Sequence, residues 1–155
     1  MIIAQANIDD ALEILSLQKL CYQSEAKIYN DYTIPPLIQT LEEIQSEFEE
    51  YFFLKALKDK RIIGSVRARM SAPDTCYIGR LIVHPDLQNQ GIGTRLMDEI
   101  EKKFRECMRW ELITGHNSQK NIKLYEKCGY HIKKAEKLTS RLSLIYFEKN
   151  NEKIE

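Results

Sequence analysis

Apolar residues near the start of the chain change from an extended run to a helical stripe. Residues 2–6 form a short apolar run that predicts a strand. Asn7 or Asp9 can then cap a helix, because apolar positions recur at helical spacing over residues 11–23. This stripe consists of Leu12, Leu15 and Cys21 or Tyr22. The first two elements are therefore predicted to be a strand and a helix.

Two consecutive prolines separate this helix from a second one. Pro35 and Pro36 interrupt the chain, because proline lacks a backbone N–H and disrupts the interior of a helix. Thr40 can cap a helix after them, and glutamates occupy the face opposite its apolar stripe. The stripe consists of Leu41, Ile44 and Phe48.

The middle of the chain has the aromatic and branched composition of strands. Residues 52–58 and 61–70, joined by a polar turn, predict an antiparallel hairpin. A third strand is expected over residues 76–83. Apolar residues then recur every four positions over residues 92–104, which predicts the central helix. Its stripe consists of Ile92, Leu96, Ile100 and Phe104.

The last third of the chain continues the alternation of strands and helices. Residues 110–114 predict a short strand, and Asn117 or Ser118 can cap a helix that reaches Lys127. Gly129 follows at the position where a left-handed cap requires glycine. The remaining segments are a hairpin of residues 130–135 and 142–147 and a charged tail, residues 149–155, which we expect to be loose.

This order of elements predicts a mixed α/β fold with antiparallel hairpins at both ends. The chain has 155 residues, which fit one domain with one core, so residues 1–155 are expected to form a single domain. No long apolar run and no leader-like start are present, and we therefore expect a cytoplasmic protein without a membrane segment.

Charge narrows the classes of partner. The 23 basic and 23 acidic side chains cancel, so the sequence does not predict nucleic-acid binding. Residues 25–50 are acidic and residues 101–137 are basic, a bias that suits a ligand with phosphates and an acceptor that is a cationic amine. The four cysteines and three histidines lack metal-ligand spacing, so no metal site is expected.

A glycine-containing loop joins the predicted strand at residues 76–83 to the central helix. It reads Gln88-Asn89-Gln90-Gly91-Ile92-Gly93-Thr94. Glycines allow close approach to the backbone, and the first N–H groups of a helix have no internal partners. The loop is therefore a candidate phosphate site. Its spacing fits neither the nucleoside-triphosphate loop nor the dinucleotide fingerprint.

The pattern Gln-x-x-Gly-x-Gly after a strand and His84-Pro85 resembles the acetyl-CoA signature of the GNAT superfamily of N-acetyltransferases. A second segment, residues 121–130, resembles the late helix of that family, which ends in LYEK-x-G-F/Y. The resemblance implies a central, twisted, mostly antiparallel sheet with helices on both faces.

The resemblance also implies a site. The strand before the loop would splay from its neighbour and pair with the pantetheine amides, the loop would hold the pyrophosphate, and Tyr125 would protonate the departing CoA thiolate. Ile92 is expected to point inward. The implied cofactor-binding residues are Leu81, Ile82, Val83, Gln88, Asn89, Gln90, Gly91, Ile92, Gly93, Thr94, Ser118, Asn121 and Tyr125.

The general base is left open. Many relatives carry a glutamate on the strand at residues 76–83, but this chain has no acid there. The proton of the acceptor ammonium could leave through water, through His116 or through Glu47. A covalent route through Cys128 is disfavoured, because no His/Asp partner can be assigned to it.

The sequence thus predicts an acetyl-CoA-dependent N-acetyltransferase that transfers the acetyl group directly to a primary amine in a ternary complex. The acceptor is a small molecule or a peptide. The alternatives are a non-catalytic acyl-CoA-binding or regulatory module and a protein acetyltransferase that acts on lysine or the N-terminus. A homodimer is conceivable, because the final strands could form an exposed edge.

Overall fold

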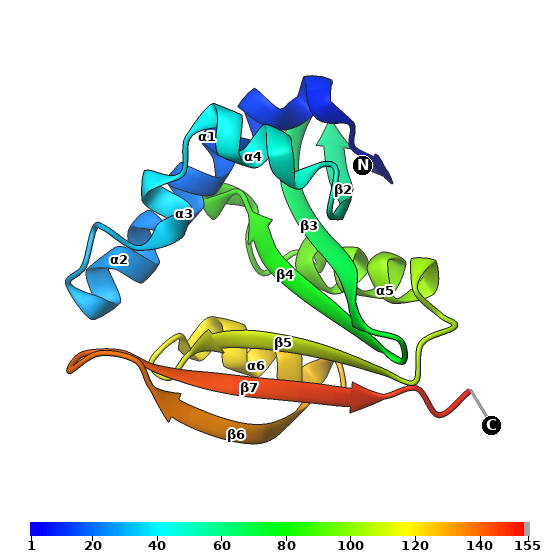
Figure 1. The fold of residues 1–155 in the computed structure, drawn as a ribbon. Coiled ribbons are helices and arrows are strands. Elements are labelled where there is room, and N and C mark those ends of the chain that lie inside the picture. The colour runs from blue at the N-terminus through cyan, green and yellow to red at the C-terminus, as the bar shows by residue number, and fades with distance from the viewer. Residues whose placement is uncertain (154–155) are drawn as a thin grey trace.

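The computed structural model describes residues 1–153, which fold around one seven-stranded sheet (Figure 1). Across the sheet the strands follow the order β1-β2-β3-β4-β5-β7-β6. The strands are β1 (Ile2–Gln5), β2 (Phe52–Lys58), β3 (Arg61–Ala72), β4 (Thr75–Val83), β5 (Arg109–Gly115), β6 (His131–Lys137) and β7 (Ser143–Asn150). Only β4 and β5 pair in parallel, so the mostly antiparallel sheet is confirmed.

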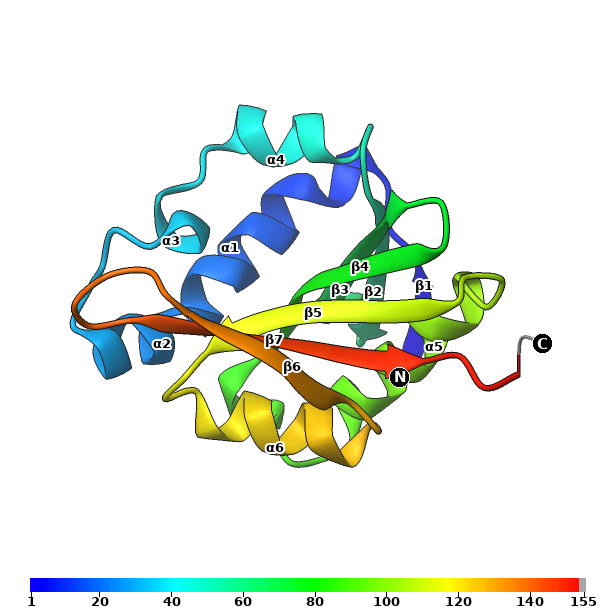
Figure 2. The same cartoon turned by 60° about the horizontal axis from the view of Figure 1, so that its bottom comes forward.

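The helices lie on both faces of this sheet, as predicted. They are α1 (Ala11–Cys21), α2 (Gln23–Tyr29), α3 (Pro35–Ile38), α4 (Leu41–Glu47), α5 (Ile92–Lys103) and α6 (Gln119–Lys127). Figure 2 shows α1 to α4 on one side of the sheet and α5 and α6 on the other. The predicted stripe of α5 is correct, since Ile92, Leu96 and Ile100 are buried in the core between α5 and the sheet.

β4 and β5 pair over only part of their lengths. Thr75–Tyr77 of β4 faces Arg109–Glu111 of β5, and no further pair joins the two strands. β4 stays paired to β3 as far as Val83, while β5 stays paired to β7 as far as Gly115. Figure 1 shows the two strands separating beyond the shared segment. Beyond Tyr77, one edge of β4 therefore has no strand partner.

The region between α1 and α4 differs from the expected interruption at the prolines. The chain forms the additional helix α2 directly after α1, and Pro35 begins the short helix α3. A proline is compatible with the first turn of a helix, because the N–H that it lacks would have no partner there. Thr40 caps α4 as predicted, since its hydroxyl accepts a 3.2 Å hydrogen bond from the backbone N–H of Glu43.

The expectation of a loose tail from residue 149 onward was wrong for its first residues. β7 extends to Asn150, because the strand continues to pair with β5 up to Arg109. The next residue, Asn151, is buried, and its side-chain amide donates to the carbonyls of Arg105 and Cys107 at 2.7 and 2.8 Å. Residues 154 and 155 of the predicted tail lie outside the described residues.

Candidate functional site

The loop between β4 and α5 presents a run of free backbone donors. Within residues 1–153, none of the seven consecutive N–H groups from Gln88 to Thr94 donates to a protein acceptor, and Arg95 is the first to do so, to Gly91 at 3.0 Å. Asn89 has φ 63° and Gly91 has φ 81°, both in the left-handed region. Left-handed residues turn successive N–H groups toward one side, an arrangement that binds anions.

The N-terminal end of α5 also favours an anion next to the loop. The helix begins at Ile92 and has 12 residues, so its N-terminal end carries a partial positive charge next to the loop. No side chain caps this end. A phosphate could accept from the free N–H groups and meet the favourable helix dipole at the same point. The residues therefore fit the pyrophosphate of a coenzyme such as CoA.

The two glycines of the loop have different roles. A Cβ atom on Gly91 would meet nothing within 4 Å, so glycine is needed there for its positive φ. A Cβ atom on Gly93 would lie 3.1 Å from Leu124 of α6 and 3.8 Å from Leu81 and Val83 of β4. Gly93 therefore allows close packing of α5 against α6 and β4. The sequence-based expectation that both glycines make room for a ligand stays a prediction.

The predicted pantetheine strand residues lie at the unpaired edge of β4. The side chains of Leu81 and Val83 face α5, and Ile82 packs into the apolar cluster with α1. The carbonyl of Val83 already accepts hydrogen bonds of 3.3 Å from the Gln88 side chain and from the Cys21 thiol. The Gln88 side chain thus holds the loop against β4.

Tyr125 of α6 lies in the apolar core of the protein and is 7% exposed. Its ring contacts the rings of Tyr130 and Phe147, with centroids 6.3 and 6.1 Å away. Within the described residues its hydroxyl has no hydrogen-bond partner. Burial raises the pKa of the Tyr125 phenol, and the nearby phenols of Tyr22 and Tyr77 raise it further. The phenol is therefore protonated and free to donate.

A polar network joins α2 to the start of α6. Ser118 is 1% exposed, and its hydroxyl donates to Glu25 Oε2 at 2.5 Å and lies 2.8 Å from the Tyr29 hydroxyl. Tyr29 also accepts from the backbone N–H of Asn117 at 2.9 Å. The Asn121 amide donates to Glu25 Oε1 at 3.3 Å. Ser118 and Asn121, predicted to contact the cofactor, are thus both turned toward Glu25.

The sequence indicated Glu25 and Tyr29 only as members of an acidic run and of a tyrosine group, and it gave neither a specific place in the site, because it did not predict α2. Glu25 has no ion-pair partner within residues 1–153, and its charge adds to the raised pKa of Tyr125. The only sequence signal was the pair of apolar residues Ala26 and Tyr29, three positions apart, which are the buried residues of α2. This spacing is weak evidence for a helix of seven residues.

The two candidate bases named from the sequence are both engaged in the protein. His116 Nδ1 accepts from the Ser143 backbone N–H at 2.9 Å, so the neutral ring carries its hydrogen on Nε2. Glu47 forms an ion pair with Arg67 and accepts a hydrogen bond from the Gln39 side chain.

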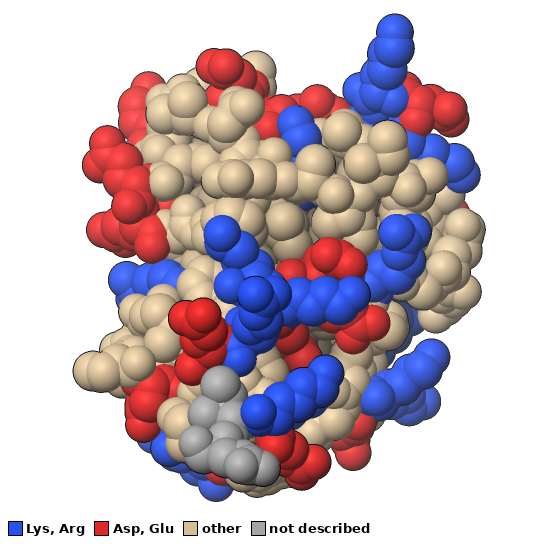
Figure 3. All heavy atoms as spheres, turned by 90° about the vertical axis from the view of Figure 1, so that its right-hand side faces the viewer, with Lys and Arg blue, Asp and Glu red and all other residues tan. Residues whose placement is uncertain are grey.

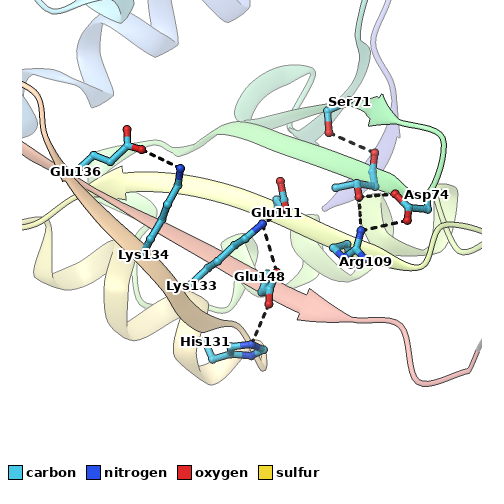
Figure 4. Close-up of polar contacts among 10 residues, drawn as sticks. Ser71, Asp74, Arg109, Glu111, His131, Lys133, Lys134, Glu136 and Glu148 are labelled. Carbon is cyan, nitrogen blue, oxygen red and sulfur yellow. Dashed lines mark hydrogen bonds and ion pairs between the residues drawn. The ribbon is translucent and has the colours of Figure 1, made fainter.

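A cavity of about 170 Å³ lies over β5, β6 and β7 and is lined in part by Tyr77, Glu111, Lys133 and Tyr146. Figure 4 shows the charged side chains around it paired with one another. Lys133 Nζ lies 3.0 Å from Glu111 Oε1, and His131 Nε2 lies 3.5 Å from Glu148 Oε1. Tyr77 extends from β4 to this cavity, which gives the site a neighbouring space.

The remaining surface adds no second candidate. A hollow of about 620 Å³, lined partly by Lys102, Lys103 and Arg105, lies at the end of α5 opposite the glycine loop. On the face in Figure 3, Lys and Arg side chains form a band that Asp and Glu interrupt and flank. Across residues 1–153 no helix has the length and apolar character needed to cross a membrane. The same residues contain no cluster of His, Cys, Asp and Glu suited to a metal.

The chain resembles known proteins over almost its whole length. YqkA of Bacillus subtilis (strain 168), a UPF0157 protein, is 29% identical over 139 residues, which are 88% of this chain and 39% of that protein. The chain spans about two fifths of the length of the curated relatives it matches.

Solved structures share the fold. That of smu.2055 from Streptococcus mutans UA159 superposes with a TM-score of 0.84 at 15% identity, over 98% of this chain and 100% of that one. An aminoglycoside 6'-N-acetyltransferase complexed with coenzyme A superposes with a TM-score of 0.76 at 18% identity, over 97% of both chains. At these identities the likeness establishes the fold.

The sequence model of the acetyltransferase (GNAT) family matches residues 11–130. The matched region covers more than half of the chain and includes β4, the glycine loop, α5 and α6. The acetyltransferase fold expected from the two sequence motifs is confirmed by the superpositions. The chain therefore belongs to the GNAT family of acetyltransferases.

Proposed function

We propose that the protein is an acetyl-CoA-dependent N-acetyltransferase that acetylates a primary amine by direct attack in a ternary complex. The observation that carries this proposal is the run of free N–H groups from Gln88 to Thr94 beside the unpaired edge of β4. The first feature suits a pyrophosphate, and the second suits the amides of an extended pantetheine arm. Both features lie on one continuous segment of the chain, as binding of one long ligand requires.

The backbone of the loop holds the phosphates, and the open edge of β4 orients the arm toward α6. Bound acetyl-CoA supplies an acetyl thioester, whose C–S bond breaks as the C–N bond to the amine forms. Tyr125 donates its phenolic proton as negative charge develops on the sulfur. An ordinary phenol, with a pKa of about 10, already keeps its proton at neutral pH. Burial raises the pKa of Tyr125 and makes it a weaker acid, so the transfer depends on the negative charge that develops on the sulfur. Positioning of the amine contributes the remainder of the rate enhancement.

The acceptor ammonium must lose a proton before it attacks. Water remains one route. His116 is less suited as a base, because its Nδ1 accepts from the Ser143 N–H and the neutral ring then carries its hydrogen on Nε2. Glu47 is less suited than its sequence position indicated, because it is paired with Arg67. Glu25 joins these candidates, since its carboxylate lies close enough to Tyr125 to affect the pKa of that phenol.

The test is a calorimetric titration with acetyl-CoA, combined with measurement of CoA release in the presence of amino acids, polyamines, aminoglycosides and peptides. We expect binding in the micromolar range, and CoA release that depends on one class of amine. Binding without release for any amine would favour the non-catalytic module. Release with peptides alone would favour protein acetylation. Absence of binding would contradict the proposed role of the loop.

A further inference from the structure

Two arginines on neighbouring strands lie on the same face of the sheet. Arg67 of β3 is paired in register with Gly79 of β4 and points toward α4. Regular alternation would place the next residue, Arg80, on the opposite face, toward α5. Arg80 instead has φ 49°, and the register of β3 and β4 shifts beside it. This bulge turns the Arg80 side chain to the side of α1–α4.

The directions of the neighbouring side chains in β4 agree with a bulge at Arg80. Ile78 belongs to the core on the α5 side, and Leu81 lies near Gly93 of α5. Gly79 and Arg80, between them, therefore both face the other side. A non-glycine residue with positive φ costs conformational energy, and such strain is concentrated at functional sites.

The two guanidinium groups are joined by a short polar chain. Arg80 Nη1 donates to Gln39 Oε1 at 3.0 Å, and the Gln39 amide donates to Glu47. Glu47 in turn is paired with Arg67. Gln18 also donates to Gln39 Oε1, at 2.8 Å. Because Gln39 is neutral, this cluster contains two positive groups and one negative group.

The positive charge is incompletely paired. Arg67 is 6% exposed, and its Nε atom is buried without an acceptor in the described part of the chain. Arg80 has no carboxylate partner within residues 1–153. A buried donor without an acceptor and a half-buried cation without an anion are both costly. Burial and the nearby charge of Arg67 lower the pKa of Arg80. The cluster therefore carries one positive charge that no carboxylate of the described residues balances.

The arginine pair lies next to the predicted reaction centre. The charges of Arg67 and Arg80 affect the pKa values of both Tyr22 and Tyr77, and these two phenols in turn affect the pKa of Tyr125. Tyr22 and Tyr77 thus connect the arginine pair with the proposed general acid. Tyr77 also lines the cavity of about 170 Å³ described above, and its hydroxyl lies 3.2 Å from the position of a Cβ atom on Gly79, the residue paired with Arg67.

The acidic run of the first half contributes little to this face. Its exposed members on or next to α4 are Glu42, Glu43, Glu49 and Glu50. Glu43 is also used in the cap of α4, because its carboxylate accepts from the Thr40 N–H at 2.9 Å. Of the acids on α4, Glu47 reaches the site, and Arg67 neutralises it. The other member of the run at the site is Glu25 of α2, which bonds Ser118 and Asn121. For the cationic amine that the charge pattern suggested, the described residues therefore offer the single carboxylate of Glu25, while most of the acidic run lies away from the site.

We propose that Arg67 and Arg80 form a subsite for a carboxylate on the acceptor, so that the substrate is a small primary amine carrying a carboxylate, such as an amino acid. The guanidinium group presents a planar fork of donors that matches a carboxylate. Arg67 is held for this by the ring of Tyr51, 4.1 Å from its guanidinium carbon. This inference deepens the proposed function and rests on it.

The experiment compares matched acceptors. The kcat/KM is measured for α-amino acids and ω-amino acids of increasing chain length, each paired with its carboxamide, which keeps the amine and loses the charge. We expect the best carboxylate acceptor to exceed its amide by about 10- to 100-fold, the size of a charge-assisted contact. Binding of the same compounds by calorimetry, without acetyl-CoA, provides an independent readout.

The matched variants are Arg80→Asn and Arg69→Gln. Asparagine tolerates the left-handed backbone of residue 80 and removes the guanidinium group, so the fold is retained. Arg69 is a half-exposed arginine that also lies over the Tyr51 ring, at 4.9 Å, and serves as the control. We expect Arg80→Asn to abolish the carboxylate preference and leave acetyl-CoA affinity unchanged, while Arg69→Gln keeps the preference.

The outcomes separate this inference from the proposed function. If acetyl-CoA binds and amides or polyamines are acetylated as well as carboxylates, the arginine subsite is wrong and the acetyltransferase stands. If acetyl-CoA does not bind but carboxylates bind in an Arg80-dependent manner, the proposed acetyltransferase function is wrong and the arginine subsite stands. A carboxylate preference that survives Arg80→Asn, with the variant folded by circular dichroism, would also overturn the inference.

Discussion

The Ser118 hydroxyl donates a 2.5 Å hydrogen bond to the carboxylate of Glu25, which links α6 to a helix 93 residues earlier in the chain. The same hydroxyl lies 2.8 Å from Tyr29, so one buried serine connects two residues of α2. This link holds α2 to the start of α6, near the region where β4 and β5 have separated. It therefore helps to fix the wall of the site on the side of α1–α4.

Replacement of Ser118 by alanine should loosen this wall. The change leaves Glu25 Oε2 and the Tyr29 hydroxyl each without one partner, at an expected cost of about 1–3 kcal/mol in the free energy of unfolding. Urea denaturation measures this loss. Ser16→Ala is the control, because Ser16 is exposed and its hydroxyl bonds only within its own helix, to the Leu12 carbonyl. Equal effects of the two substitutions would show that the Ser118 network carries no stability.

Gly91 should tolerate asparagine better than alanine. Its φ of 81° is unfavourable for alanine, whereas asparagine adopts the left-handed region more readily, and there is space for a side chain. We expect Gly91→Ala to cost about 1 kcal/mol of stability and to weaken acetyl-CoA binding, since the loop N–H groups turn away. Gly91→Asn should lie closer to the wild type in stability and in acetyl-CoA affinity. Calorimetric titration and thermal denaturation of both variants provide the comparison.

Tyr125→Phe should separate binding from chemistry. The phenylalanine ring keeps the contacts with Tyr130 and Phe147 and removes only the hydroxyl, which makes no hydrogen bond to the described residues. We expect acetyl-CoA affinity to remain within about twofold, and kcat to fall by about 100-fold or more, the usual contribution of a general acid. An unchanged kcat would remove Tyr125 from the mechanism.

Cys21 should make stability fall at alkaline pH. Burial raises the pKa of its thiol from 9.0 to about 12. Between these values the unfolded chain releases the proton while the folded protein keeps it, so rising pH favours unfolding. The stability that the protonated Cys21 thiol contributes is fully present below pH 9 and is lost as the pH rises toward 12. Urea denaturation between pH 8 and 11 should therefore show a shallower decline for Cys21→Ala than for the wild type, and parallel curves would refute this.

Asn151 should stabilise the end of the chain despite its position in a charged segment. Its amide donates to two carbonyls, those of Arg105 and Cys107. Asn151→Asp keeps the shape and loses the donors, so we expect about 1–3 kcal/mol of destabilisation. The neighbouring exposed Asn150→Asp provides the control in the same denaturation assay. If both substitutions have the same small effect, the buried contacts of Asn151 are unimportant.

Local signals in the sequence were sufficient for the strands, for α5 and for the glycine loop. The four-residue recurrence of Ile92, Leu96 and Ile100 specifies a buried stripe, and the glycines mark the strand-to-helix turn. Each of these features depends on neighbours within a few positions. The loop residues can therefore be located from the sequence alone, and their binding role stays a prediction.

Other features depend on distant contacts and could not be predicted. α2 is stabilised by Ala26 and Tyr29 packing against segments far along the chain, and its sequence lacks a long stripe and a side-chain cap. The left-handed backbone of Arg80 is equally hidden, because arginine has no preference for that conformation. The arginine pair depends on the register of β3 and β4, so the sequence could not predict it or the carboxylate-bearing acceptor that we propose from it.

The central claim is that the backbone of residues 88–94 binds the pyrophosphate of acetyl-CoA. The most direct measurement is a titration of ¹⁵N-labelled protein with acetyl-CoA, followed by amide chemical shifts. We predict that the largest changes occur at the amides of Gly91, Gly93 and Thr94, because a phosphate becomes their first hydrogen-bond acceptor. Saturation of the protein with changes confined to other segments, or no change at millimolar acetyl-CoA, would contradict the account.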